Sequence, residues 1–146
     1  MQDLVLICAV LAAVLSVADA GEPEDARALQ GTWVPVQGEV GGKSMPEAVV
    51  KAIALKLSGE GYVVTVTGAP EPDEGTWKLD TAATPKGMTI TGLKGPNAGK
   101  TFPAIYELTG DTLRICYDLS GVKRPEGFRT SPGTQLFLVT YRRKPG

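Results

Sequence analysis

The sequence predicts an all-β domain built as one eight-stranded antiparallel up-and-down barrel, with one or two short helices. Apolar and polar residues alternate with a period of two through most of the chain after residue 54. Short turns rich in glycine separate several of these runs, and no helical segment is long enough to connect parallel strands. Closing such a sheet removes its unpaired edges. A two-sheet sandwich remains the alternative, because periodicity does not distinguish a closed sheet from an open one.

The first twenty residues have the pattern of a secretory signal peptide. An apolar run extends from Leu4 to Val17, which is short for a membrane span, and Ala18-Asp19-Ala20 is a small-residue cleavage site. The n-region carries Asp3 and no basic residue, so an uncleaved anchor is the alternative. We expect residues 1–20 to be removed and the protein to be exported, to the periplasm or the exterior, with no membrane association after cleavage.

The mature chain, residues 21–146, has a composition that narrows its function. Its length suits one domain with a modest core. Without Asp3 and Asp19 the 16 acidic residues fall to 14, against 15 basic residues, so no nucleic-acid partner is indicated. The chain contains no histidine, which removes the usual general base and the usual zinc ligand. We therefore expect neither an enzyme nor a metal or cofactor site.

The mature chain begins with two helical segments that flank the first strand. Acidic residues near the start of 22–30 suit a helix N-terminus, and Gly31 suits the helix end. The apolar residues of 46–53 have helical spacing, which predicts a short helix that covers one end of the barrel. The expected strands are 32–39, 55–57, 62–67, 76–80, 88–91, 102–108, 113–118 and 135–142.

The segment Leu29-Gln30-Gly31-Thr32-Trp33 resembles the signature of the lipocalins. The resemblance implies that Gly31 and Trp33 close one end of the barrel, with a basic residue of the last strand packed on the tryptophan. Both faces of the last strand are apolar, so Arg142 and Arg143 remain alternatives. We expect Arg142.

Further motifs resemble a family of small secreted lipocalin-like domains that is abundant in planctomycete bacteria. That family has no established activity, so the resemblance implies a fold and an exported location and no chemistry. The motifs cover nearly the whole mature chain and are Leu29-Gln30-Gly31-Thr32-Trp33, Gly75-Thr76-Trp77-Lys78-Leu79-Asp80, Pro85-Lys86, Gly99-Lys100-Thr101, Ile105-Tyr106-Glu107-Leu108, Gly110-Asp111-Thr112-Leu113, Cys116 and Arg124-Pro125-Glu126-Gly127-Phe128.

Three other features have simpler structural explanations. The acidic loop 71–74 lacks the ligand spacing of a calcium loop, because Pro70 and Pro72 interrupt it. The glycines of 92–100 are followed by a strand and not by the helix of a phosphate loop. Export removes Cys8 and leaves Cys116 without a disulfide partner, so Cys116 is either buried or reactive, and we expect it to be buried.

The lengths of the connections predict a binding site at one end of the barrel. Connections alternate between the two ends, and the long ones gather opposite Trp33. Two functions remain open: a carrier of a small, mainly apolar ligand, and a solid barrel used as a structural or protein-interaction module. For the carrier we expect Arg124 and Phe128 on the rim, and Tyr106 and Tyr117 as polar contacts inside. Arg124 would face an anionic group of the ligand; the alternative is that it only pairs with Asp118 and that the loop is structural.

Overall fold

The structure is a computed structural model that describes residues 21–145. The predicted signal peptide, residues 1–20, lies outside the described residues. The described part of the chain contains two helices and nine strands. They are α2 (Gly21–Ala28), β1 (Gly31–Val40), β2 (Lys43–Ser44), α3 (Glu47–Lys51), β3 (Ile53–Ser58), β4 (Gly61–Val66), β5 (Asp73–Asp80), β6 (Gly87–Lys94), β7 (Thr101–Thr109), β8 (Thr112–Asp118) and β9 (Leu136–Arg143).

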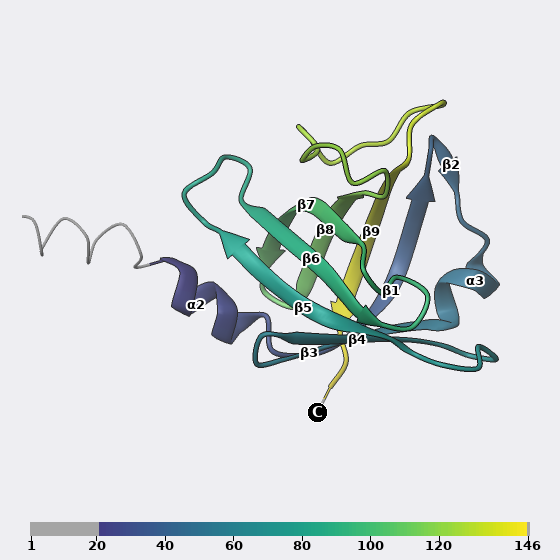
Figure 1. Cartoon of the computed structure of the whole chain (residues 1–146), viewed down its shortest axis with the longest axis horizontal. Coiled ribbons are helices and arrows are strands. Elements are labelled where there is room, and N and C mark those ends of the chain that lie inside the picture. The colour runs from purple at the N-terminus through teal and green to yellow at the C-terminus, as the bar shows by residue number, and fades with distance from the viewer. Residues whose placement is uncertain (1–20, 146) are drawn as a thin grey trace, which may run out of the picture.

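The sheet is a closed antiparallel barrel, as the sequence predicts (Figure 1). From β3 to β9 each strand pairs with the next, and β1 pairs with both β3 and β9, which closes the barrel. The two-residue β2, which was not predicted, pairs with the end of β1. Eight strands therefore form the barrel, and the predicted sandwich alternative is wrong.

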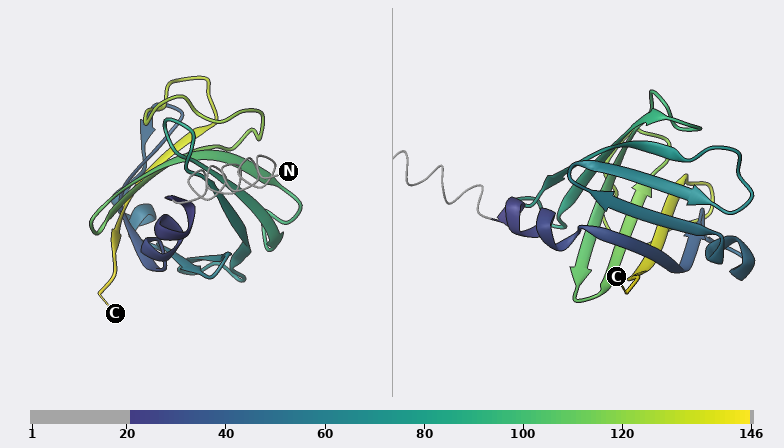
Figure 2. Two further views of the ribbon diagram at one scale, coloured as in Figure 1. Left: turned by 90° about the vertical axis from the view of Figure 1, so that its left-hand side faces the viewer. Right: turned by 90° about the horizontal axis from the view of Figure 1, so that it is seen from below.

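The two ends of the barrel differ. Helix α2 lies across one end, which we call the α2 end (Figure 2, left). The two-residue turns β3–β4 and β7–β8 lie at this end, together with the six-residue β5–β6 connection, whose Lys86 pairs with Asp25 of α2. The β1–β3, β4–β5, β6–β7 and β8–β9 connections lie at the other end, which we call the open end. Helix α3 packs beside β1 and β3 at the open end. Both tight turns are at the α2 end, as predicted, but the β5–β6 connection at this end is as long as the β4–β5 and β6–β7 connections at the open end.

Alternation along the strands separates an apolar interior from the outer surface. In β8, for example, Leu113, Ile115 and Tyr117 face the interior, and Arg114 and Cys116 face outward. The inward-facing residues of all eight strands join Leu29, which follows α2, in one core cluster. Burial of this apolar surface is the main stabilisation of the barrel.

The long loop 119–135 covers part of the outer wall. The hydroxyl of Thr130 donates a hydrogen bond to Glu39 of β1, and the Cys116 thiol lies 3.8 Å from the carbonyl oxygen of Arg129. Cys116 and its strand neighbour Ile105 face outward, yet both are fully buried. Strands β7 and β8 are therefore covered on both faces.

None of the helices in the described range 21–145 has the length and apolar character needed to cross a membrane.

Candidate functional site

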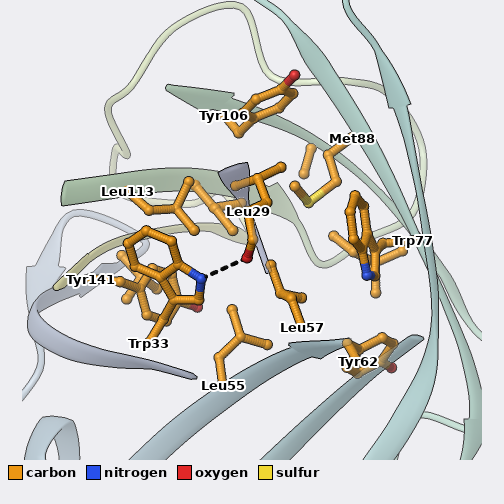
Figure 3. Packing of buried hydrophobic residues seen from close by; sticks show 14 of the residues in the cluster. Leu29, Trp33, Leu55, Leu57, Tyr62, Trp77, Met88, Tyr106, Leu113 and Tyr141 are labelled. Carbon is orange, nitrogen blue, oxygen red and sulfur yellow. Dashed lines mark hydrogen bonds between the residues drawn. The ribbon is translucent and has the colours of Figure 1, made fainter. Parts of the chain in front are cut away.

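The α2 end of the barrel is closed around Trp33, as predicted. Trp33 is fully buried, and its indole N–H donates a 2.9 Å hydrogen bond to the carbonyl oxygen of Leu29 (Figure 3). Leu29 is also fully buried and lies between Trp33 and the inward-facing residues of the neighbouring strands. The Trp33 side chain that closes this end of the barrel therefore also satisfies the backbone carbonyl of Leu29.

The basic residue on Trp33 is Arg143, and the expectation of Arg142 is wrong. The guanidinium carbon of Arg143 lies 4.3 Å from the centre of a Trp33 ring. Strand pairing places Arg143 directly opposite Trp33, on the inward-facing side of β9 with Val139 and Tyr141, whereas Arg142 is exposed. Both faces of β9 are apolar, so the sequence does not show whether Arg142 or Arg143 faces the interior.

Arg143 also binds the end of α2. Its two terminal nitrogens each donate a 2.6 Å hydrogen bond, one to the carbonyl oxygen of Ala28 and the other to that of Gln30. The Ala28 carbonyl is one that the end of a helix leaves without a partner, and Gln30 lies in the link to β1. Gly31 has a φ of +129°, and a Cβ there would lie 3.2 Å from a guanidinium nitrogen of Arg143. Glycine at position 31 therefore allows the strand to start close to the arginine.

Tyr106 lies at this closed end and does not line the interior cavity. Its hydroxyl donates a 2.6 Å hydrogen bond to Asp25 of α2, and Lys86 pairs with the same carboxylate oxygen at 2.9 Å. Burial, and then the adjacent Asp25, raise the pKa of Tyr106 above its usual range, so it stays a neutral donor. The structure places Tyr106 outside the set of residues that line the interior cavity.

A cavity of about 170 Å³ occupies the barrel interior between the closed end and the open end. Asn97 and Leu119, from the connections at the open end, are part of its lining. Most of the lining is aliphatic or aromatic. The lining residues are Pro35, Ile53, Leu55, Leu57, Tyr62, Val64, Asp73, Trp77, Met88, Ile90, Asn97, Phe102, Ile115, Tyr117, Leu119, Phe137, Val139 and Tyr141.

Tyr117 lines the cavity, where it was predicted. Its hydroxyl lies 2.8 Å from that of Tyr141, and its ring stacks on Phe137 with a centroid distance of 5.5 Å. Burial raises the pKa of Tyr141 to about 12 and that of Tyr117 well above its usual value. The two hydroxyl groups therefore remain neutral and bond to each other.

A second polar group of the cavity centres on Asp73 at the start of β5. One carboxylate oxygen accepts a 3.3 Å hydrogen bond from the Tyr62 hydroxyl, and the other accepts a 2.9 Å bond from the Asn97 amide. Burial, followed by the charge of Asp73, raises the pKa of Tyr62 above its usual range. Tyr62 and Asn97 thus orient the carboxylate as neutral donors.

Arg124 and Phe128 do not lie on the rim of the cavity, contrary to expectation. Arg124 crosses the outer wall, where it pairs with Asp80 at 3.2 Å and donates a 3.3 Å hydrogen bond to Thr89. The Phe128 ring lies under the guanidinium of outward-facing Arg114, at 4.4 Å. The reason is that the part of loop 119–135 that carries both residues folds back over the outer surface of the barrel.

A glycine of β6 explains why Arg124 can approach the wall so closely. Gly87 of β6 has no side chain, and a Cβ there would lie 2.4 Å from the Arg124 guanidinium. The Nε of Arg124 is buried without a hydrogen-bond partner among the described residues. Arg124 therefore packs against β6 and helps to hold loop 119–135 on the outer wall of the barrel.

Cys116 is buried, as expected. Its side chain is fully covered, and burial raises the pKa of its thiol above the usual value. A raised pKa and lack of access both make the thiol unreactive.

Sequence reasoning missed most of the cavity lining, above all Asp73. We assigned it to a solvated acidic loop, whereas β5 begins at Asp73, three residues before the expected start. The signal was present: Asp73 and Gly75 are in phase with Trp77 and Leu79. The two prolines before Asp73 obscured it.

Within residues 21–145 no group of three or more acidic, histidine or cysteine side chains is arranged to hold a metal ion. Comparisons with protein-family models, with curated protein sequences and with solved structures found no match to this chain.

Proposed function

We propose that the protein is an exported lipocalin-like barrel that binds one small, mainly apolar molecule in its interior. The observation that supports this proposal is the interior cavity, which is lined by apolar side chains from strands all around the barrel. Cavities with apolar walls and a few placed polar groups are typical of small-molecule sites.

The size of the cavity limits the class of ligand. Its volume of about 170 Å³ is close to that of an engineered apolar cavity of about 150 Å³ that binds benzene. It is below the ~300 Å³ at which pockets for drug-sized ligands begin. A ligand with one six-membered ring, or an aliphatic chain of similar volume, fits this space, whereas a long lipid does not.

Titration of the purified protein with toluene, followed by amide NMR, tests the proposal. The chain has two tryptophans, so their indole N–H groups give two signals. Trp77 lines the cavity and Trp33 does not, although both donate 2.9 Å hydrogen bonds to carbonyl oxygens. We expect toluene to shift the Trp77 signal in a saturable way and to leave the Trp33 signal in place.

A matched pair of variants in β4 controls this experiment. Val64 lines the cavity, whereas Val63 faces the outer surface. Val64→Phe should fill the space and abolish the toluene shift, and Val63→Phe should leave the shift unchanged. Absence of any saturable shift in the unmodified protein, or an equal shift in both variants, would refute a ligand site in the cavity.

Export is a second part of the proposal and has its own test. It rests on the apolar run and the small-residue cleavage site of residues 1–20. N-terminal sequencing of the protein isolated from its host should give Gly21 as the first residue. A mature protein that starts at Met1 would contradict cleavage.

The alternative function is a protein-interaction module, and one observation favours it. Several exposed apolar side chains lie at or near the ends of strands at the open end, namely Val40, Val66, Leu93 and Leu119. Exposed apolar groups that form a contiguous patch are typical of a contact surface. Under this alternative the cavity takes no ligand, so the toluene titration also separates the two functions.

A further inference from the structure

Among the described residues, Asp73 is the one charged side chain that lines the cavity. The other residues that line it are apolar, aromatic or, in the case of Asn97, a neutral amide. No ion pair among the described residues includes Asp73. The carboxylate therefore brings an unneutralised negative charge to the wall of an apolar space.

The hydrogen bonds of Asp73 leave room for a further donor. An ionised carboxylate has about four acceptor positions. Tyr62 uses one on one oxygen and Asn97 uses one on the other. Both donors are neutral, so they fix the orientation of the group without cancelling its charge.

The position of Asp73 also suits a charged partner. It is half-buried and lies next to Asn97, which belongs to the connection at the open end. A cation that reached it from the cavity would keep part of its hydration, while the apolar part of the same molecule lay deeper among residues such as Trp77 and Ile90. This arrangement reduces the desolvation penalty that a fully buried ion pair would incur.

We propose that the cavity selects a small organic ammonium ion, that is, an amine whose apolar body fills the barrel and whose nitrogen donates to Asp73. This inference rests on the proposed function, because it concerns the same cavity. The ammonium ion replaces the anionic ligand expected from the sequence, because Arg124 lies on the outer wall and no basic side chain within residues 21–145 lines the cavity.

A series of ligands with one ring and different polar groups tests the inference on the purified protein. The series is toluene, benzyl alcohol, benzylamine as the ammonium ion, and benzoate. We expect benzylamine to bind at least about tenfold more tightly than toluene, since hydrogen bonds to charged groups are the stronger class. Benzoate should bind most weakly because its charge repels Asp73. The advantage of benzylamine should decrease as salt is added.

Two neighbouring substitutions provide the matched control. Asp73→Asn removes the charge and keeps the shape of the side chain, so the affinity for benzylamine should fall to that for benzyl alcohol while toluene binding persists. Glu74→Gln removes the same charge one residue later, on the outer surface between Lys56 and Lys94, and should leave the preference intact. Equal effects of the two substitutions would show that net charge, and not Asp73, attracts the amine.

The outcomes separate this inference from the proposed function. Saturable toluene binding without a preference for benzylamine overturns the inference and leaves the carrier function standing. Binding of no member of the series overturns both. Preferential binding of benzylamine that Asp73→Asn removes supports both, and the ligand series with the unmodified protein decides the question even if this variant fails to fold.

Discussion

Replacement of Arg143 by alanine should destabilise the barrel by about 3 kcal/mol. The cation–π contact with Trp33 contributes about 1 kcal/mol, because 28% of the Arg143 side chain is still exposed. The hydrogen bonds to the carbonyl oxygens of Ala28 and Gln30 contribute about 1 kcal/mol each, less than fully buried charged bonds. The pair with Asp111 adds little, because that carboxylate is 78% exposed.

Urea unfolding of the Arg143→Ala and Arg142→Ala variants measures this difference. Arg142 is exposed and adjacent in the same strand, so its replacement should change the free energy of unfolding by less than about 0.5 kcal/mol. Both variants should keep the denaturant dependence of the parent protein, which shows that the same surface is exposed on unfolding. If Arg142→Ala costs as much as Arg143→Ala, or if Arg143→Ala costs less than about 1 kcal/mol, the assigned closure of the α2 end is wrong.

Two further predictions concern loop 119–135 and its flank. Burial of Asp118 favours a higher pKa, but hydrogen bonds from Lys123 and Ser120 outweigh it and hold the pKa below the usual 3.8. The stabilisation by Asp118 is therefore complete above about pH 5 and is lost as the pH falls through the lowered pKa. Asp118→Asn should therefore lower the free energy of unfolding in urea more at pH 7 than at ~pH 2, and an equal loss at both values would contradict this account. Arg124→Ala and Phe128→Ala should lower stability by about 1–2 kcal/mol and leave toluene affinity unchanged, because both side chains lie on the outer wall. Weaker toluene binding in either variant would instead connect the loop with the cavity.

The alternation of residues was sufficient to predict the barrel. Each of the eight expected strands overlaps an observed one, and Trp33 closes the end at which the first strand begins. These features depend on the period of two and on a large aromatic residue after a glycine, which are local properties of the chain. Local properties can be read from a single sequence.

The position of loop 119–135 is indicated by another feature of the sequence, the continuous apolar runs in β7 and β8. Ile105 and Cys116 face outward, and each lies between two apolar residues that face inward. Such continuous apolar runs indicate a strand that is buried on both faces. Another segment of the chain must therefore cover the outer face of β7 and β8, and loop 119–135, the longest connection between strands, does so. Because the sequence does not show which segment provides the cover, Arg124 and Phe128 were assigned to the rim.

The closed end joins the beginning of the described chain to its end, and this has a consequence for folding. Arg143 bonds to Ala28 across 115 residues, and Tyr106 to Asp25 across 81. During synthesis Asp25 and Ala28 leave the ribosome long before Tyr106 and Arg143. Until β9 has been made, β1 and β8 present unpaired edges, and α2 lacks the arginine that fixes it. The barrel therefore cannot close before β9 has been synthesised, and its folding rate is limited by these long-range contacts.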